Sequence, residues 1–202
     1  MDKLFYENLY IEKGAKYVCG VDEVGRGPLA GPVTVCAVIM DLSKIVDGVD
    51  DSKKLSEKKR EKLFPLISAA AVDMSIVSVG PEVIDEINIL NATKQAMQQA
   101  IMNLKVKPDV VLVDAVQLDI PYNKTHAIIK GDSLSYSIGC ASILAKVTRD
   151  AYMIKADEIY PDYGFKSNKG YGSAKHIAAL KEKGATPIHR KSFIKNFVGD
   201  NK

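Results

Sequence analysis

Residues 16–31, KYVCGVDEVGRGPLAG, constrain the fold and the chemistry of this 202-residue chain more than any other segment. An apolar run ends directly in two acids, Asp22 and Glu23, which is unusual because an unpaired buried carboxylate is costly. Gly25, Arg26 and Gly27 follow at once, and glycine lets the backbone turn sharply or approach a ligand closely. The segment therefore predicts a strand whose acids hold a divalent metal, followed by a loop that cradles a nucleic-acid backbone.

The composition is that of a folded protein with one main core. At 47% hydrophobic residues, 202 residues suffice for such a core. No apolar run approaches the roughly 20 residues of a membrane-spanning helix, and the acids near the N-terminus make it a poor secretion signal. Cys19, Cys36 and Cys140 are odd in number and widely spaced, which disfavours a disulfide framework and a zinc ribbon. We therefore expect a cytoplasmic protein and, because no long exposed apolar stripe is evident, a monomer.

Hydrophobic patterning predicts the order of the secondary structure. Strands are expected at residues 16–24, 32–40, 72–79, 109–114 and 126–130. Helices are expected at 56–70 (with Ser56 as N-cap), 81–88, 91–104, 135–158 and 173–183, with a loop at 165–173. Strands come first and then alternate with helices, which predicts an α/β fold with a mixed five-stranded sheet flanked by helices. We expect one α/β domain at residues 1–160 and a basic helical segment at 161–202 packed on it.

Three predicted strands lead into acids: Asp22 and Glu23, then Asp114, then Asp132. Acids at neighbouring strand ends converge on one edge of a sheet, and their oxygens are the ligands that Mg²⁺ and Mn²⁺ prefer. Adjacent strand residues point to opposite faces, so we expect the first strand to end or bulge near Gly25; otherwise one of the paired acids is not a direct ligand. Two simpler roles stay open, Asp132 as a helix cap and Asp114 as a turn residue.

Positive charge is concentrated in two segments. Residues 166–195 contain eight Lys or Arg and one acid, Glu182, and residues 53–62 contain six Lys or Arg. A basic surface beside an acidic site is typical of proteins that bind a polyanion. Lysine-rich helices are also often merely solvated, so charge alone leaves both interpretations open.

Six motifs together resemble bacterial ribonuclease HII. They are VDEVGRGPLAGPV, DSKKLSEKKR, LVDA, KGDS, ASILAKVTRD and NKGYGSAKH, in this order, and the resemblance spans about residues 15–195. It implies a ribonuclease H-like fold, with residues 1–160 as the catalytic domain. It also implies an endonuclease that cleaves the RNA strand of RNA–DNA hybrids. The implied enzyme incises duplex DNA 5′ to a single embedded ribonucleotide, the start of ribonucleotide excision repair, and leaves 3′-hydroxyl and 5′-phosphate ends.

The resemblance also assigns roles to residues. The family's catalytic, metal-binding acids correspond to Asp22, Glu23, Asp114 and Asp132. The GRG loop, whose backbone contacts the ribose 2′-hydroxyl, corresponds to Gly25, Arg26 and Gly27. The tyrosine that packs on the sugar at the RNA–DNA junction corresponds to Tyr171. This chain departs from the family at Ala115, where glycine is common after the third acid; the ligand is retained, so we expect activity to be retained.

Both lines of reasoning lead to one mechanism. Two divalent ions, Mn²⁺ or Mg²⁺, are expected to bind the four acids together with the substrate and to activate water for hydrolysis of a phosphodiester. Cations outside the cluster are expected to contact backbone phosphates. The candidates are Lys53, Lys54, Lys146, Lys169, Lys175, His189 and Arg190. Lys146 lies on a helix with a buried pattern, so its alternative role is to pair with one of the four acids.

Two other functions stay open. A non-catalytic nucleic-acid-binding protein of the same fold would use the basic segments alone, but converging acids repel phosphate unless a metal intervenes. A two-metal phosphatase of small molecules would use the acids alone and would not need a long basic surface. The expected partner is therefore an RNA–DNA hybrid or a DNA duplex with an embedded ribonucleotide.

Overall fold

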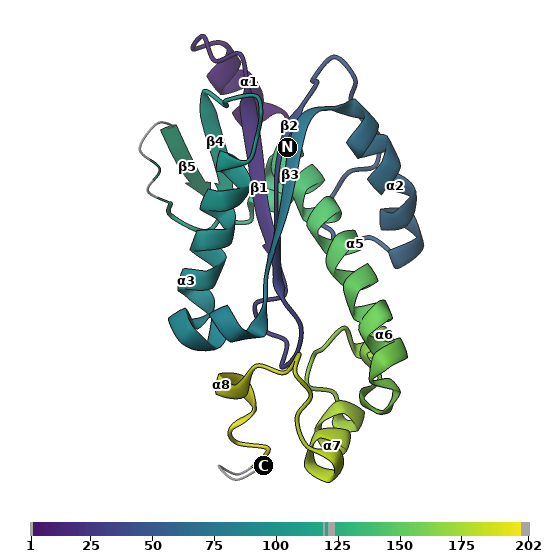
Figure 1. Ribbon diagram of the computed structural model, residues 1–202. Coiled ribbons are helices and arrows are strands. Elements are labelled where there is room, and N and C mark those ends of the chain that lie inside the picture. The colour runs from purple at the N-terminus through teal and green to yellow at the C-terminus, as the bar shows by residue number, and fades with distance from the viewer. Residues whose placement is uncertain (1, 119, 121–123, 199–202) are drawn as a thin grey trace.

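The computed structural model describes residues 2–118, 120 and 124–198 (Figure 1). These residues contain a five-stranded sheet. Its strands are β1 (Val18–Val24), β2 (Val33–Met40), β3 (Ala71–Val79), β4 (Val110–Asp114) and β5 (Lys124–Ile128). Their order across the sheet is β3-β2-β1-β4-β5, and the predicted mixed α/β fold is confirmed. The fifth strand lies two residues earlier than predicted, because the chain turns at Lys130, whose φ is 60°.

The central strand, β1, has neighbours of opposite direction. β2 pairs with it antiparallel and β4 pairs with it parallel, while β5 pairs parallel with β4. The parallel strands end at the same edge of the sheet, so the acids in the last residues of β1 and β4 lie at that edge. The ladder between β1 and β4 ends where Val21 pairs with Val113, and beyond it β1 continues beside β2.

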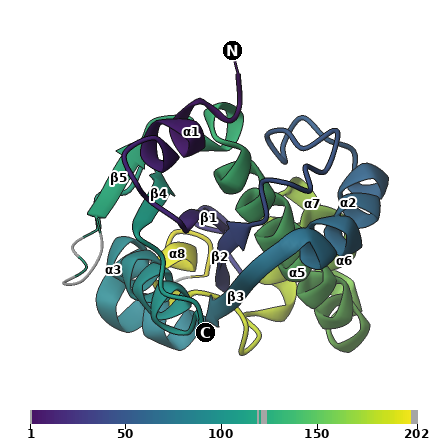
Figure 2. The ribbon, with the colours of Figure 1, turned by 90° about the horizontal axis from the view of Figure 1, so that it is seen from above.

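The helices cover both faces of the sheet (Figures 1 and 2). Their bounds are α1 (Phe5–Ile11), α2 (Glu57–Ala70), α3 (Pro81–Met102), α4 (Gly131–Leu134), α5 (Tyr136–Ile159), α6 (Phe165–Asn168), α7 (Ala174–Lys183) and α8 (Lys191–Ile194), with a 3₁₀ turn η1 (Pro161–Tyr163). The Ser56 hydroxyl accepts a hydrogen bond from the N–H of Lys59 and caps α2, as predicted. The helices predicted at 81–88 and 91–104 are joined in α3, where Asn88 has a φ of 64°. No helix in the described ranges has both the length and the apolar character that a membrane crossing requires.

Alternate residues of β2 enter two different cores. Val35 packs in the core formed with α3, which contributes Ala96 and Met97. Cys36 packs in the core formed with α2 and α5, to which α5 contributes Ile143. Because both faces of β2 are covered, its sequence, VTVCAVIM, is apolar except for Thr34, whose hydroxyl lies 2.8 Å from that of Ser78. The three cysteines are free and buried, in agreement with the expectation that they form no disulfide.

The C-terminal part of the chain packs around the end of α5 (Figure 1). Phe165, Leu180 and Ile194 share a core with Met153 of α5. The predicted loop at 165–173 begins with the short helix α6, so the prediction was wrong for its first four residues. The reason is a compact turn: the side chain of Asn168 donates to the carbonyl of Tyr163 at 2.7 Å and accepts from the N–H of Gly170 at 2.8 Å.

The N-terminal helix α1 anchors the start of α5. The side chain of Glu7 is fully buried, and its Oε1 accepts hydrogen bonds from Ser135 Oγ at 2.6 Å and from the N–H of Ser137 at 2.9 Å. A carboxylate at a helix N-terminus satisfies unpaired N–H groups and opposes the positive end of the helix dipole. The helix that approaches the acids is therefore fixed at its first turn.

Candidate active site

The four predicted acids form one electrostatic cluster at the edge of the sheet where β1 and β4 end. Burial raises the pKa of Asp22, which is 4% exposed, and the charges of Glu23 and Asp114 raise it further. Burial also raises the pKa of Glu23, and Asp114 again adds to the effect. Burial followed by the charge of Asp114 raises the pKa of Asp132. Asp114 is thus close to each of the other three.

The first strand ends at Val24, directly before Gly25, as the first of the two predicted alternatives has it, and it does not bulge at the paired acids. β1 and β2 keep a regular register along their whole paired length, and Asp22 and Glu23 leave opposite faces of the strand. Asp22 contacts Ser142 of α5, whereas Glu23 lies 3.4 Å from Arg26. Both carboxylates are close to Asp114 because β4 no longer pairs with β1 at this point, which opens the edge beside them.

The donor set of the cluster fits a hard divalent cation. All four ligands are carboxylates, and Oε2 of Glu23 is buried without a hydrogen-bond partner in the described part of the chain. A bound cation would relieve the mutual repulsion that raises the pKa values. Among the described residues, no three His, Cys, Asp or Glu side chains are close enough to hold a metal ion by themselves. The acids form an open cluster that needs further oxygen ligands.

Asp114 connects the sheet to the turn that carries Asp132. Its Oδ1 accepts a hydrogen bond from the N–H of Gly131 at 2.7 Å. A Cβ atom at Gly131 would lie 2.6 Å from Cδ1 of Ile138, so glycine allows the close approach. The simpler roles considered from the sequence, Asp132 as a helix cap and Asp114 as a turn residue, do not describe these acids. Asp132 lies inside α4 while Ser135 caps α5, and Asp114 binds a distant segment instead of its own turn.

Ala115 has a backbone conformation that glycine prefers. Its φ is 50°, in the left-handed region, which costs a non-glycine residue about 1 kcal/mol or more. We expect Ala115→Gly to raise the free energy of unfolding by up to about 1 kcal/mol, measured by urea denaturation. In contrast, Ala178→Gly on the exposed face of α7 should lower it by about 1 kcal/mol. A stability loss in both variants would contradict the strain at Ala115.

Two serines that were not among the predicted residues connect the DSKKL segment (residues 51–55) to the acids. Ser142 of α5 hydrogen-bonds Asp22, and its Oγ lies 2.8 Å from Oγ of Ser52. Lys53 follows, with its Nζ 3.7 Å from Oδ2 of Asp132. Burial alone lowers the pKa of Lys53, but the charges of Asp132 and Asp22 outweigh it and raise the pKa. The sequence offered one signal for the role of Ser52: it stands next to Lys53 and Lys54, which were predicted to contact the substrate.

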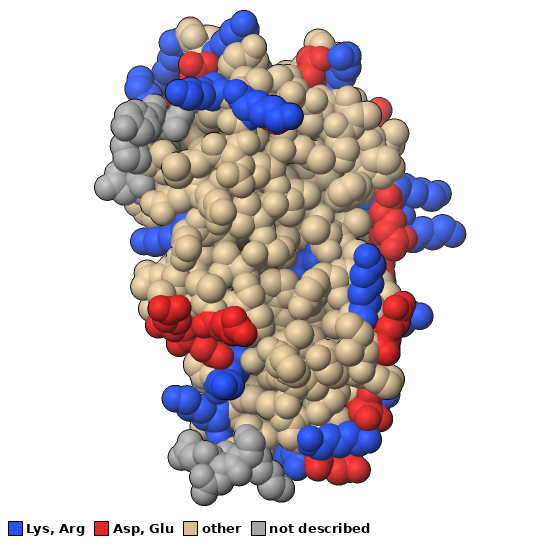
Figure 3. Space-filling model, viewed as in Figure 1, with Lys and Arg blue, Asp and Glu red and all other residues tan. Residues whose placement is uncertain are grey.

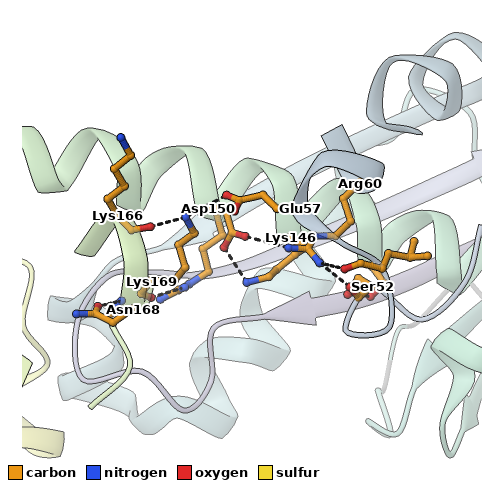
Figure 4. Close-up of polar contacts among 12 residues, drawn as sticks. Ser52, Glu57, Arg60, Lys146, Asp150, Lys166, Asn168 and Lys169 are labelled. Carbon is orange, nitrogen blue, oxygen red and sulfur yellow. Dashed lines mark hydrogen bonds and ion pairs between the residues drawn. The ribbon is translucent and has the colours of Figure 1, made fainter. Parts of the chain in front are cut away.

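A buried ion-pair network holds the DSKKL segment on α5 (Figure 4). Arg60 donates to the carbonyl of Ser52 at 2.8 Å and lies 3.7 Å from Asp150. Lys146 donates to the same carboxylate at 2.8 Å. Lys146 therefore pairs with Asp150, outside the four-acid cluster, and not with one of the four acids as its alternative role had it.

The other predicted cations are distributed around the surface. Lys54 is exposed and lies 4.0 Å from Asp50, and Lys175 is exposed on α7. Lys169 pairs with Glu57 at 3.1 Å (Figure 4). On the face shown in Figure 3, Lys and Arg side chains lie mainly around the rim, with acidic side chains among them.

Arg190 is fully buried, so the prediction that it contacts a phosphate was wrong. Its guanidinium donates to the backbone carbonyls of Gly31 at 3.0 Å, of Arg26 at 2.9 Å and of Gly25. Burial and the neighbouring Arg149 lower the pKa of Arg190 to about 9. Its hydrogen bonds hold the GRG loop (residues 25–27), and its burial keeps the guanidinium away from a substrate phosphate.

Arg149 of α5 is a second fully buried arginine, and it was not singled out from the sequence. It donates to the carbonyls of Pro32 at 2.8 Å, of Ala30 at 3.1 Å and of Lys169 at 2.9 Å. A Cβ atom at Gly25 would lie 2.2 Å from Nε of Arg149, which explains the glycine. This arginine therefore joins the segment after the GRG loop to the segment that leads into Tyr171.

Tyr171 lies against the GRG loop. A Cβ atom at Gly27 would lie 3.7 Å from Cε1 of Tyr171. The N–H of Leu29 donates to the carbonyl of Gly170 at 2.8 Å, which holds the two loops together. The Tyr171 side chain is 46% exposed and therefore accessible to a ligand.

His189 is also buried, so its predicted phosphate contact was wrong as well. It is 3% exposed, and its Nε2 lies 2.9 Å from Nε2 of His176. Burial, together with the His176 ring, lowers the pKa of His189 to about 4. Burial likewise lowers the pKa of His176.

His189 makes the stability of the protein depend on pH. The pKa of His189 is about 4 in the folded protein and 6.5 in the unfolded protein. Between these pH values the unfolded state therefore binds more protons than the folded state. The stabilisation is complete above pH 6.5 and is lost as the pH falls toward 4, by up to about 3 kcal/mol. Urea unfolding of the wild type and of His189→Gln, in EDTA, separates this effect from that of the acids, whose raised pKa values act in the opposite direction. An identical pH dependence in the two proteins would contradict the assignment.

Comparison with known proteins identifies the family of this chain. The family model for ribonuclease HII matches residues 19–196. The ribonuclease HII of Caldicellulosiruptor bescii is 53% identical over 193 residues, covering 95% of this chain and 93% of that protein. The ribonuclease HII of Clostridioides difficile is 54% identical over 193 residues, covering 96% of this chain and 76% of that protein.

Solved structures share the fold. The crystal structure of ribonuclease H2 from Pyrococcus horikoshii has a TM-score of 0.75 and 30% identity, covering 87% of this chain and 93% of that chain. The ribonuclease HII in a complex with PCNA from Archaeoglobus fulgidus has a TM-score of 0.72 and 28% identity, covering 86% of this chain and 93% of that chain. The fold is therefore ribonuclease H-like. On these matches the chain belongs to the ribonuclease HII family of metal-dependent ribonucleases H.

Proposed function

We propose that this protein cleaves the RNA strand of RNA–DNA hybrids and incises duplex DNA on the 5′ side of a single embedded ribonucleotide, leaving 3′-hydroxyl and 5′-phosphate ends. One observation carries the proposal. The acid cluster at the end of β1 leads directly into the GRG loop, and Tyr171 lies against that loop. Oxygen ligands for a metal and a loop suited to contact a sugar are therefore adjacent.

The acids would hold two divalent ions, Mg²⁺ or Mn²⁺, when a nucleic acid supplies further oxygen ligands. The proposed ligands are Asp22, Glu23, Asp114 and Asp132. Such ions stabilise charge on a phosphate and lower the pKa of water. The protein keeps the carboxylates in place: Ser142 hydrogen-bonds Asp22, and the N–H of Gly131 holds Asp114.

The GRG loop is oriented to offer backbone N–H groups to a ribose. Arg190 binds the carbonyls of Gly25 and Arg26. In a planar trans peptide the C=O and the following N–H point in opposite directions, and the described chain contains no cis peptide. The N–H groups of Arg26 and Gly27 therefore point away from Arg190. We propose that these groups contact the 2′-hydroxyl, which distinguishes RNA from DNA, and that the Tyr171 ring packs on the sugar.

Fewer cations are proposed for the phosphates than the sequence suggested. Lys53, Lys54 and Lys175 are exposed. Lys146 and Lys169 would first have to leave their carboxylate partners. We propose that the protein acts as a monomer on an RNA–DNA hybrid or on a DNA duplex with an embedded ribonucleotide, and that it does so in the cytoplasm.

The direct test is incubation with a DNA duplex that contains one internal ribonucleotide, with Mg²⁺, Mn²⁺ or EDTA. We expect a single cut on the 5′ side of the ribonucleotide with either metal, no cut with EDTA and no cut in the all-DNA duplex. A cut elsewhere, or equal cleavage of the all-DNA duplex, would refute the proposal. An excess of p-nitrophenyl phosphate should be neither hydrolysed nor inhibitory; rapid hydrolysis would favour the small-molecule phosphatase.

A further inference from the structure

Two buried histidines lie directly behind the loop that carries Tyr171. His176, in the first turn of α7, is fully buried, and the rings of Tyr163 and Phe165 pack around both histidines. Nδ1 of His176 lies 2.9 Å from the carbonyl oxygen of Tyr171. The Nε2 atoms of His176 and His189 are 2.9 Å apart, and Nδ1 of His189 lies 2.9 Å from the backbone nitrogen of Thr186.

The hydrogen-bond partners at the two ends of this row of histidines, Tyr171 and Thr186, determine which ring nitrogens carry protons. The backbone N–H of Thr186 is a donor, so Nδ1 of His189 accepts and its Nε2 carries the proton. The carbonyl of Tyr171 is an acceptor, so Nδ1 of His176 carries the proton and its Nε2 accepts. Nε2–H of His189 therefore donates to Nε2 of His176. One set of neutral tautomers satisfies all three hydrogen bonds.

The hydrogen bonds through His176 and His189 hold the backbone carbonyl of Tyr171 from one side. The same carbonyl also accepts a hydrogen bond from the N–H of Ser173 at 2.8 Å, and the N–H of Tyr171 donates to the carbonyl of Asn168 at 2.9 Å. Both polar backbone groups of Tyr171 are therefore held. The side chain projects from a fixed peptide toward Gly27, although it is half exposed.

We propose that His189 and His176 are positioning residues that hold Tyr171 against the GRG loop through its carbonyl. The inference rests on the proposed role of Tyr171 at the sugar of the ribonucleotide. The histidines do not touch the substrate: they reduce the freedom of the ring before binding, so the ring is already in place when the sugar arrives.

The test separates the two nitrogens of His176. In His176→Asn the amide nitrogen takes the place of Nδ1 and keeps a donor near the carbonyl of Tyr171. In His176→Gln the amide reaches the position of Nε2, and that donor is lost. With a duplex that contains one ribonucleotide, we expect kcat/KM to fall about tenfold for His176→Gln, mainly through KM, and about twofold for His176→Asn. Thermal melting establishes that each variant is folded.

A double-mutant cycle shows whether the effect passes through the tyrosine. In a Tyr171→Ala background, His176→Gln should lower kcat/KM by less than about twofold. As a matched control, His126→Gln breaks a 2.8 Å hydrogen bond to Tyr10 and should leave kcat/KM unchanged. Equal losses for the Asn and Gln variants, or an undiminished loss in the Tyr171→Ala background, would overturn the proposal. Failure of the wild type to cut at the ribonucleotide would instead refute the proposed function.

Nitrogen-15 spectra of the histidine rings test the proton arrangement without any variant. In the wild type at neutral pH, we expect the proton on Nδ1 of His176 and on Nε2 of His189. The opposite tautomers, or a charged ring, would overturn the proposal.

Discussion

Replacement of Asp22 by asparagine is expected to abolish cleavage of a duplex with one ribonucleotide while leaving binding of that duplex almost unchanged. Asn keeps the shape of Asp22 and accepts the hydrogen bond from the N–H of Glu23, but it removes a charge that the proposed metal ions need. We expect kcat to fall by at least about 10³-fold and Kd to change by less than about threefold, because cations outside the cluster supply most of the affinity. Single-turnover cleavage and fluorescence anisotropy measure the two quantities.

The same variant should be more stable than the wild type when metal is absent. The raised pKa of Asp22 means that the fold disfavours its charge, so a neutral side chain should stabilise the protein by about 1 kcal/mol or more, roughly 2–4 °C in Tm. Asp109, at the other end of β4, is the matched control. The N–H groups of Tyr17 and Lys16 lower its pKa, so Asp109→Asn should lower Tm. A fall in Tm for Asp22→Asn in EDTA would contradict the repulsion assigned to the cluster.

Arg190→Lys is expected to destabilise the protein and to impair cleavage, although the charge is conserved. The planar guanidinium reaches three backbone carbonyls at once, whereas a lysine ammonium has a single nitrogen. At least one buried carbonyl would lose its partner, so we expect a loss of about 2–4 kcal/mol in the free energy of unfolding. We also expect kcat/KM to fall by at least about tenfold, because the N–H groups of the GRG loop lose their orientation.

Arg26→Lys provides the control for stability, because this arginine lies in the same loop and its side chain is 43% exposed. It should change the free energy of unfolding by less than about 0.5 kcal/mol. Urea denaturation of both variants, with cleavage measured at a temperature where both are folded, tests the prediction. Equal stability of Arg190→Lys and the wild type would show that the carbonyl contacts do not hold the loop.

The sheet could be predicted from the sequence because its signals are local. Apolar runs that are buried on both faces and helical spacing locate the strands and the main helices. The errors lie where a single residue decides the backbone. Lys130 ends the fifth strand early through its left-handed conformation, and the side chain of Asn168 turns part of a predicted loop into α6.

The position of the acids could also be predicted, because neighbouring parallel strands end at the same edge of a sheet regardless of how the other segments pack. The supporting residues could not be assigned, because their partners are backbone carbonyls of distant segments. Arg190 stands in a basic segment and looks like a phosphate ligand, yet its partners are 159 to 165 residues away in the sequence. The sequence left open whether β1 ends or bulges near Gly25, for a similar reason: the open edge beside Asp22 depends on where β4 stops pairing with β1.

The most direct test of the account is the location of Mn²⁺ by anomalous diffraction in crystals of the protein with a ribonucleotide-containing duplex. The account predicts manganese between the carboxylates of Asp22, Glu23, Asp114 and Asp132, with the ribose beside Gly27 and the ring of Tyr171. Manganese bound at any other acids, or a ribose that lies away from the GRG loop, would contradict it.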